Sequence, residues 1–364
     1  KTRYGYAGTL IWKSMDIRYI TMRFKAELAS EQLQILLSLI GPISRLAQHC
    51  VVFLDKKCVR LSIRDAMEGI SCFCELNAAN DGIFLQHRIE SIANDEIVFE
   101  IDLIQWKTAL QSIAIGRNDG SSSTADDGLH RSTLNNKRNY NGLLTKTTTI
   151  MKLAKRHGGI PCLCLDGMKG SIEVYHAIPI RVMRASDMQN HLPPHINMPD
   201  VQLEITNEKP LRIVVERLKS IAPHVYIQGS MDGKLILRVD ADASSIQTYF
   251  SRLIPRFEDT KQPTEGHQRK SSSNLDREDM TINSCTLKLE TKKLLLSLLW
   301  QQQYQSSPNS NSMTTLSTTS SALLCMVENE MLVLHVLLQP TSVGFFTYYV
   351  PVHYLSASSQ TSQL

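Results

Sequence analysis

The sequence predicts an α+β protein built from two similar halves. Strand-like runs are abundant, because short stretches of apolar and β-branched residues alternate with polar turns. Four other segments space their apolar residues three and four positions apart, as one face of a helix requires. The order strand, helix, several strands, helix, more strands occurs once before residue 183 and again after residue 200. This repeated order predicts two domains of similar architecture.

Length, composition and charge limit the possible functions of the chain. Its 364 residues are typical of two domains, and a hydrophobic content of 42% can supply a core for each. The formal net charge of +4 is small, so any attraction to nucleic acid must come from local patches. No apolar run approaches the roughly 18–20 residues that a membrane-spanning helix needs, and we expect no membrane association.

Three polar segments contain too few large apolar residues to form a core, and we expect them to be insertions or loops. The start of the chain shows no pattern of a signal peptide and is expected to lie outside the fold. The predicted organisation is an N-terminal extension at 1–21, a first domain at 22–183 with an insertion near 116–145, a connector at 184–199, and a second domain at 200–355 with insertions near 256–281 and 304–320.

In the first half, a strand at 23–29 leads to a helix with Ser30 as a candidate N-cap. Gly41-Pro42 should kink or interrupt this helix. A hairpin is predicted at 51–63, and a second helix should begin after Asp102. The apolar faces of the two helices are Leu33, Leu36, Leu37, Ile40 and Ile43 in the first, and Trp106, Leu110, Ile113 and Ala114 in the second.

The second half repeats this order. A strand at 201–205 leads to a helix that Pro210 should open and Pro223 should follow. The remaining elements are a hairpin at 225–239 turning at Asp232-Gly233, a helix around 294–300, a hairpin at 323–338 and a strand at 344–352. Helix starts are about 71 residues apart in the first half and about 82 in the second, where an insertion is included.

The stretch between the halves has three possible readings: a surface loop, a metal-binding histidine cluster or a tether. His191 and His195 are four positions apart, but Pro193-Pro194 between them prevents a helix that would bring them together. A metal site would also need two further ligands that the neighbouring sequence does not offer. The prolines instead stiffen the chain and keep it out of either sheet, which favours a connector.

The eight cysteines do not predict a metal site either. The two close pairs are Cys72 with Cys74 and Cys162 with Cys164, and this spacing puts both members of a pair on one face of a strand. Buried, reduced thiols explain the pattern better than zinc ligands or a disulfide framework.

Several short motifs resemble the Hus-one family of checkpoint sliding-clamp subunits. Their order and spacing together carry the resemblance, which extends over roughly 22–355 apart from the three insertions. The motifs are MRFKA at 22–26, IPCLCLD at 160–166, HAIPIRV at 176–182, MPDVQLEI at 198–205, VVERLKSI at 214–221, MDGKLILRV at 231–239 and YYVPV at 348–352.

The resemblance implies a sliding-clamp fold of the PCNA-like, DNA-clamp type, in which each of two similar domains has antiparallel sheets outside and two helices lining the hole of a ring. It implies a heterotrimer with Rad-nine-like and Rad-one-like subunits that encircles double-stranded DNA, without sequence specificity, at damage or recessed junctions. An ATP-driven loader would place the ring, and checkpoint and repair proteins would bind it in the nucleus. Two alternatives remain open at this point: a replicative-type homotrimeric clamp, and a DNA-processing enzyme with an unrecognised site.

The four predicted helices are enriched in basic residues, as a hole that attracts phosphates requires. They contain eight Lys and Arg against three Asp and Glu, whereas the whole chain has 39 against 35. Ordinary solvated helix faces are the alternative explanation. The candidate DNA-facing residues are Arg45, Lys107, Lys209, Arg212, Arg217, Lys219, Lys292 and Lys293.

Ring closure implies that an edge strand of one subunit pairs with an edge strand of the next. The candidates by position are 160–165, with Ile160, Cys162 and Cys164, and 244–252, with Ile246, Thr248 and Phe250. Both strands could instead be covered within the chain. Next to the connector, Met183, Met188 and Leu192 could border a pocket for partner peptides, or could simply anchor the connector.

No catalytic residue, metal ligand or cofactor is predicted. The sequence lacks the nucleotide-binding patterns G-x-x-x-x-G-K-[ST] and G-x-G-x-x-G, and it lacks H-E-x-x-H and G-x-S-x-G. A clamp needs a closed ring, a positive hole and docking surfaces rather than an active site. We therefore do not expect an enzyme.

Overall fold

The computed structural model describes residues 22–64, 69–78, 82–114, 148–169, 172–206, 210–241, 244–256, 283–301, 319–338 and 343–353. The predicted N-terminal extension and most of each predicted insertion lie outside these residues. Within them, no helix combines the length and the apolar character needed to cross a membrane.

The two halves have the same order of elements, as predicted. In the first half the elements are β1 (Arg23–Leu28), α1 (Ser30–Ile43), β2 (His49–Leu54), β3 (Cys58–Ile63), β4 (Ser71–Asn77), β5 (Gln86–Glu90), β6 (Ile97–Asp102), α2 (Leu103–Ala114), β7 (Thr149–Lys155), β8 (Pro161–Lys169) and β9 (Ile172–Met183). In the second half they are β10 (Val201–Thr206), α3 (Leu211–Lys219), β11 (His224–Ser230), β12 (Lys234–Ala241), β13 (Ser244–Phe250), β14 (Ile254–Pro255), β15 (Ser284–Glu290), α4 (Thr291–Ser297), β16 (Thr319–Val327), β17 (Met331–Leu338) and β18 (Gly344–Pro351).

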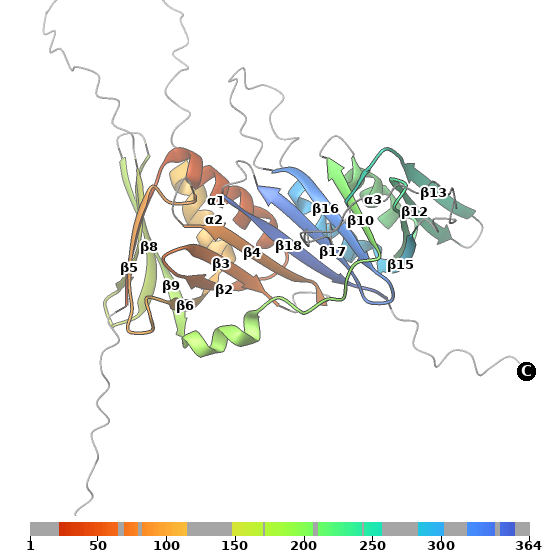
Figure 1. Ribbon diagram of the computed structural model, residues 1–364. Coiled ribbons are helices and arrows are strands. Elements are labelled where there is room, and N and C mark those ends of the chain that lie inside the picture. Colours follow the sequence, from red (N-terminus) through yellow and green to blue (C-terminus); the bar gives the residue numbers. More distant parts are fainter. Residues whose placement is uncertain are drawn as a thin grey trace, which may run out of the picture.

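The strands form one long antiparallel sheet and one short one (Figure 1). The long sheet has the order β14-β10-β16-β17-β18-β4-β3-β2-β6-β9-β8-β7-β1-β5, and the short sheet has the order β13-β12-β11-β15. The halves meet where β18 pairs with β4, with Gly344 opposite Leu76 and Tyr349 opposite Ser71. The backbone of the last strand therefore completes a sheet that begins in the first half.

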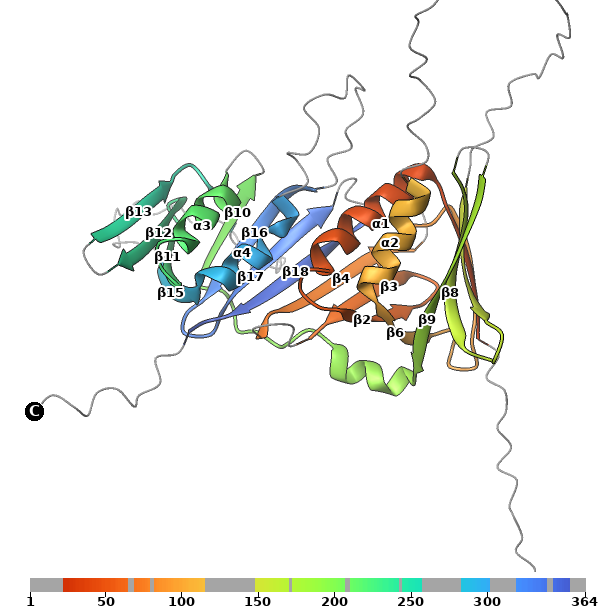
Figure 2. The same ribbon diagram turned by 180° about the vertical axis from the view of Figure 1, so that it is seen from behind.

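Among the described residues, the α-helices α1 to α4 lie on one face of the molecule, and the outer surfaces of the sheets form the other (Figure 2). Helix α1 packs against α2, and α3 packs against α4. The apolar helix faces point at the sheets, and Leu33, Leu36, Trp106 and Leu110 are all buried. One continuous hydrophobic cluster extends through both halves. Each fully buried Leu or Ile in such a core contributes roughly 1.5–3 kcal/mol relative to an exposed one.

Two details of α1 differ from the sequence-based prediction. The N-cap is Ala29 rather than Ser30, and the Ala29 N–H donates to the Gln32 side-chain oxygen at 3.0 Å. Gly41-Pro42 does not interrupt the helix, which continues to Ile43. Pro42 lies in the last turn, where the loss of one backbone hydrogen bond and the ring's clash with the preceding turn disturb little of the helix.

The turn into β18 depends on a glycine. Gly344 has φ of +141°, and a Cβ at this position would collide with the backbone carbonyl oxygen of Glu75 on β4. Only glycine adopts this conformation without strain. The close contact with β4 is therefore possible because residue 344 has no side chain.

We predict that Gly344→Ala lowers the free energy of unfolding by about 1–3 kcal/mol, measured by urea denaturation. Gly41→Ala is the matched control, because Gly41 lies in α1, where an added methyl group would meet no atom within 4 Å. This change should leave stability unchanged or raise it by roughly 0.5–1 kcal/mol. Equal stability of the two variants would contradict the role given to Gly344.

Candidate functional site

Most of the predicted DNA-facing residues belong to the helices α1 to α4 or directly follow one, and Figure 2 shows these four helices together on one side of the sheets. Arg217 and Lys219 are exposed in the last turn of α3, and Lys292 is exposed in the first turn of α4. In the first half, Arg45 is exposed just beyond α1, and Lys107 is half-buried on α2. Lys209 lies outside the described residues. Five of the eight predicted residues are thus exposed or half-buried on these helices or beside them.

Ion pairs hold Arg212 and Lys293 against the protein. The Arg212 guanidinium lies 3.6 Å from Glu216, and Lys293 Nζ lies 2.8 Å from Glu290. Each basic side chain is only 14% exposed. The hydrogen bond from Lys293 lowers the pKa of the Glu290 carboxyl, so this carboxylate stays charged near neutral pH. Their positive charge is largely compensated locally, and they have little freedom to reach a phosphate.

The start of α2 is fixed by Asp102. One Asp102 carboxylate oxygen accepts a hydrogen bond from the Gln105 backbone N–H at 2.9 Å, and the other accepts from Gln48. Partial burial raises the pKa of Asp102, but these hydrogen bonds outweigh it and the pKa is lowered. A charged carboxylate at a helix N-terminus also interacts favourably with the helix dipole. This cap sets the position of α2 and hence of Lys107 on the helix face.

The connector at 184–199 crosses the outer face of the sheets, below β2 and β6 in Figure 1. Its first part is a 3₁₀ helix, η3 (Ala185–His191). Ser62 Oγ donates to the His191 carbonyl at 2.9 Å, and the Arg64 guanidinium donates to the Asn190 carbonyl. Further along, the Asn197 side-chain amide donates to Glu330 at 2.9 Å. The connector is thus tied to both halves.

The three residues predicted to border a peptide pocket do not share one environment: Met183 and Met188 lie at the same buried cluster, whereas Leu192 is exposed. Met188 is only 7% exposed and packs against Val51, Phe53, Cys58 and Val98 on the outer face of the sheet. Met183 is half-buried beside the same cluster, whereas Leu192 is 46% exposed. For Met188 the burial favours the second of the two expected roles, an anchor for the connector, because a long apolar side chain gains from being buried against the sheet.

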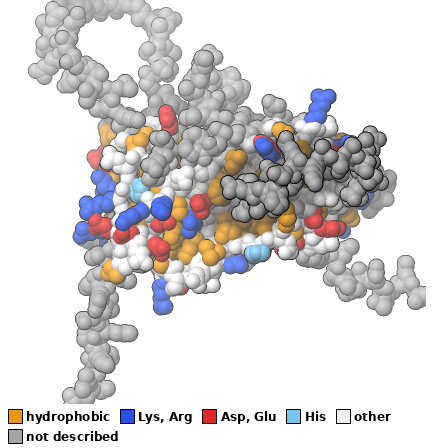
Figure 3. All heavy atoms as spheres, viewed as in Figure 1, with side chains coloured by type: hydrophobic (Ala, Val, Ile, Leu, Met, Phe, Trp, Pro, Cys, Tyr) orange, Lys and Arg blue, Asp and Glu red, His pale blue; other side chains and the backbone are white. Residues whose placement is uncertain are grey.

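Hydrophobic side chains nevertheless gather in the middle of this outer face (Figure 3). At the junction of the halves, the rings of Phe73 and Tyr349 pack edge to face with centroids 5.5 Å apart. Farther along β18, Phe345 is directly paired with Leu337 on the neighbouring strand β17. The two side chains are 42% and 43% exposed. These residues were not predicted from the sequence. The strands are apolar on both faces, so the sequence pattern does not indicate which face is exposed.

The first predicted interface strand is wrong as an edge. Strand β8 lies between β7 and β9, and its backbone is paired on both sides. Cys162 and Cys164 are each 1% exposed, and only Ile160, just before the strand, is on the surface at 51%. A buried apolar run has the same pattern in a central strand and in an edge strand, so the sequence could not separate the two.

The second predicted interface strand is an edge. Strand β13 ends the short sheet and pairs only with β12. Ile246 is 38% exposed and Thr248 is half-buried, while Phe250 is buried at the end of the strand. On the opposite face of the same strand, Tyr249 is 67% exposed. An edge with exposed apolar side chains can accept a further strand.

Strand β9 is a second open edge that sequence analysis did not identify. Its last residues, Ile180 to Met183, pair with β6, whereas the part from Ile172 to Pro179 pairs with β8 alone. Ile172 and Tyr175 in this part are 65% and 57% exposed. The sequence indicated a strand only from residue 176, so the exposed first part of this edge was not recognised.

A groove of about 280 Å³ runs between α2 and this part of β9. It is lined by Ile104, Gln105, Thr108, Ala109, His176, Ala177 and Ile178. Ile104 is 56% exposed at its rim, and His176 Nε2 lies in hydrogen-bond contact with Ser112 Oγ on α2. The groove and the open edge form one surface of mixed apolar and polar character.

The described residues contain no group of three or more His, Cys, Asp and Glu side chains placed to hold a metal ion. All eight cysteines are free and buried. Burial raises the pKa of the Cys58 and Cys285 thiols to about 12, so both are protonated near neutral pH. Protonated thiols are poor nucleophiles and poor metal ligands.

Comparisons with known proteins agree with this architecture. Residues 22–353 match the family described as Hus1-like protein. The chain is 26% identical over 242 residues to a checkpoint protein hus1 homolog of Dictyostelium discoideum, covering 65% of this chain and 77% of that protein. It is 26% identical over 220 residues to checkpoint protein HUS1 of Homo sapiens, covering 58% of this chain and 66% of that protein.

The solved structure of PCNA from Thermococcus kodakaraensis superimposes on this chain with a TM-score of 0.53. The two are 12% identical, and the match covers 91% of this chain and all of the other. This likeness confirms the predicted sliding-clamp fold, and the family match confirms the resemblance found in the motifs. With this fold, the chain belongs to the Hus1-like protein family of checkpoint clamp subunits.

Proposed function

We propose that this chain is one of three different subunits of a ring that encircles double-stranded DNA at damage or recessed junctions in the nucleus. Its neighbours are a Rad-nine-like and a Rad-one-like subunit. The observation that carries this proposal is the strand pairing at the junction of the two halves, because the same junction can be repeated between subunits.

The junction joins five strands of the second half, ending at β18, to four strands of the first half, beginning at β4. The repeated order of elements identifies the corresponding sets. The five strands of the first half end at β9, and the four strands of the second half end at β13. These two edges do not meet within the chain. Pairing β9 of one subunit with the β13-like strand of its neighbour would repeat the internal junction and, with three subunits, close a ring.

The exposed apolar side chains on both edges support this pairing. Ile172 and Tyr175 on β9, and Ile246 and Tyr249 on β13, are each at least 38% exposed. Uncovered apolar edges promote aggregation, so a partner strand that covers them is physically favoured. The groove between α2 and β9 extends the same surface and would receive side chains of the neighbouring subunit's helix.

We divide the chain into clamp domains at 22–183 and 200–355, with 184–199 as the connector between them. The equal order of elements in the two parts and the single crossing of the connector over the outer face support this division. The connector and the apolar outer face around Phe73 and Tyr349 are where checkpoint and repair proteins would dock, with Leu192 as the exposed connector residue.

The helix face is the surface that we assign to DNA. Arg45, Lys107, Arg217, Lys219 and Lys292 would contact phosphates through water or directly, which gives affinity without sequence specificity. Arg212 and Lys293 would contribute less because of their ion pairs. The chain would not act as an enzyme, and the energy for opening the ring would come from an ATP-driven loader.

A homotrimer is the second candidate, because both open edges occur in the same chain and three copies could in principle close a ring. Membership of a family of checkpoint subunits favours different neighbours. The two candidates differ in the composition of the ring and are separable by experiment.

We expect that co-expression with the Rad-nine-like and Rad-one-like chains of the same organism gives a complex with one copy of each, measured by size-exclusion chromatography with light scattering. The chain expressed alone should aggregate or bind chaperones, because its edges are uncovered. Self-assembly into trimers would favour the homotrimer, and a stable monomer that ignores both other chains would contradict the proposal.

We predict that Ile172→Asp releases one neighbour from the complex while the other stays bound, because a charge would be buried in the β9 interface. The expected loss is about 2 kcal/mol or more, roughly a 30-fold weaker contact. Ile92→Asp is the control: Ile92 is also 65% exposed but lies in the loop between β5 and β6. The readout is the subunit composition of the purified complex, and equal behaviour of the two variants would contradict this use of β9.

We predict that Arg217→Gln with Lys219→Gln weakens retention of the loaded ring on closed circular DNA and lowers the salt dependence of binding, by a slope of about 1–2. Arg212→Gln should have a smaller effect, since this side chain pairs with Glu216. Lys234→Gln on the short sheet, 65% exposed and paired with Asp232, is the control. An unchanged retention of the double variant would show that α3 does not face DNA.

A further inference from the structure

Three basic residues stand side by side across neighbouring strands on the outer face of the first half. The register puts Lys25 on β1 directly opposite Arg88 on β5 and directly opposite Lys152 on β7. Their side chains are 56%, 78% and 40% exposed. Neighbouring strands are about 4.8 Å apart, so the row is about 10 Å wide. Like charges directly opposite each other destabilise a sheet, so stability does not explain this row.

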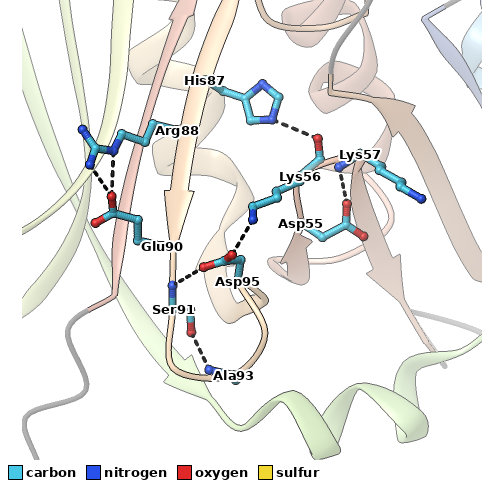
Figure 4. A network of polar contacts seen from close by, with 9 residues as sticks. All are labelled: Asp55, Lys56, Lys57, His87, Arg88, Glu90, Ser91, Ala93 and Asp95. Atoms are coloured by element: carbon cyan, nitrogen blue, oxygen red, sulfur yellow. Dashed lines mark hydrogen bonds and ion pairs between the residues drawn. The ribbon is translucent and has the colours of Figure 1, made fainter.

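The arrangement of the surrounding side chains leaves the row accessible. Alternate residues of β1, Phe24 and Ala26, point into the core, and Lys25 therefore points outward. Figure 4 shows Arg88 on the side of β5 away from His87 and the ion pair between Lys56 and Asp95. In Figure 3, Lys and Arg side chains gather at the same end of the molecule, over β5 and β8, with Asp and Glu among them.

The two lysines of the row are only weakly neutralised. Lys25 Nζ lies 3.6 Å from Glu27, and Lys152 Nζ lies 3.9 Å from Asp166. Both separations exceed the length of a hydrogen bond, and such exposed pairs contribute little. Arg88 is held more firmly, because its Nε donates to Glu90 at 2.7 Å. An anion above Lys25 would thus find two available ammonium groups and a guanidinium already held in place.

We propose that Arg88, Lys25 and Lys152 bind the phosphate of a phosphorylated serine or threonine on a partner protein. A phosphate monoester carries nearly two negative charges and three acceptor oxygens at neutral pH, which matches three neighbouring cationic donors. A single carboxylate on a partner would replace the contacts that the two lysines already make with Glu27 and Asp166. The new contacts would be of the same kind, so little binding free energy would be gained. The dianion gains an additional charge interaction, so the row selects for phosphorylation.

The carboxylates beside the row favour an isolated phosphate over nucleic acid as the ligand. Glu27 and Asp166 lie on one side of the row, and Glu90 lies on the other. The row belongs to a line of paired residues, Arg88, Lys25, Lys152 and Cys164, that crosses four strands. Each carboxylate residue lies two positions along its strand from this line, a distance of about 6.6–6.8 Å. On one side the next phosphate of a nucleic acid would meet the carboxylates of Glu27 and Asp166. On the other side it would meet Arg23, which lies opposite Glu90 and already pairs with it at 3.8 Å. A phosphopeptide carries one isolated dianion and needs no such neighbouring contacts.

The test uses fluorescence anisotropy of a short fluorescein-labelled peptide of Gly, Ala and Val with one central phosphoserine, titrated with the full chain in its complex. The phosphopeptide should bind and its unphosphorylated twin should not. Lys25→Gln with Lys152→Gln should weaken binding by about tenfold or more. Glu27→Gln should strengthen it several-fold, because a competing carboxylate is removed. Inorganic phosphate should compete with the peptide.

Lys234→Gln, a similarly exposed lysine on the short sheet, is the matched control and should bind like the unchanged protein. The double variant removes like charges, so its melting temperature should be equal or higher, and a folding defect would not explain lost binding. Equal binding of the two peptides, or no strengthening in Glu27→Gln, would overturn the proposal. Tighter binding of a short oligothymidylate through the same lysines would overturn it in favour of nucleic acid.

Discussion

The antiparallel pairing of β18 with β4 is the contact on which the rest of the structure depends. It places the last strand of the chain against the first half, and it makes the two halves share one sheet and one hydrophobic cluster. On the inner face of β18, Phe346 and Tyr348 are buried, and on the outer face Tyr349 packs on Phe73. The approach of Gly344 to Glu75 leaves no room for a side chain. The two halves are therefore fixed relative to each other by backbone hydrogen bonds as well as by packing.

This internal junction also defines what is left unpaired. Each half contributes a five-strand set and a four-strand set, and the junction uses one set from each. The remaining sets end at β9 and β13, whose edges carry exposed Ile and Tyr residues. Within the described residues, neither of these edges is paired along its whole length. The proposed assembly would repeat between subunits the backbone pairing that joins the two halves.

Local patterns in the sequence predicted most helices and strands, but not which strands lie next to each other in the sheets. The helices followed from apolar spacing, and the Asp232-Gly233 turn is present with Gly233 at φ of +83°. Position along the chain predicts β8 as an edge, but it pairs on both sides, and its buried apolar run contains no information on whether one or two strands flank it. The burial of Met188 and the row formed by Arg88, Lys25 and Lys152 depend on connector path and strand register. Neither can be read from a single sequence, since both join residues far apart in the chain.

The two halves share backbone topology but differ in the chemistry of equivalent surfaces. His49 pairs with Asp102 just before α2, and His224 pairs with Glu290 just before α4, so Val51 and Tyr226 occupy equivalent positions two residues later. Around Val51 the outer face is apolar, and the connector covers it. Around Tyr226 it is polar, with Arg238 and Lys288 against the ring at 4.7 and 5.5 Å. The connector lies against the apolar face around Val51, so that face gains from burial. The two halves thus share their strand pairing, while their outer faces differ in what lies against them.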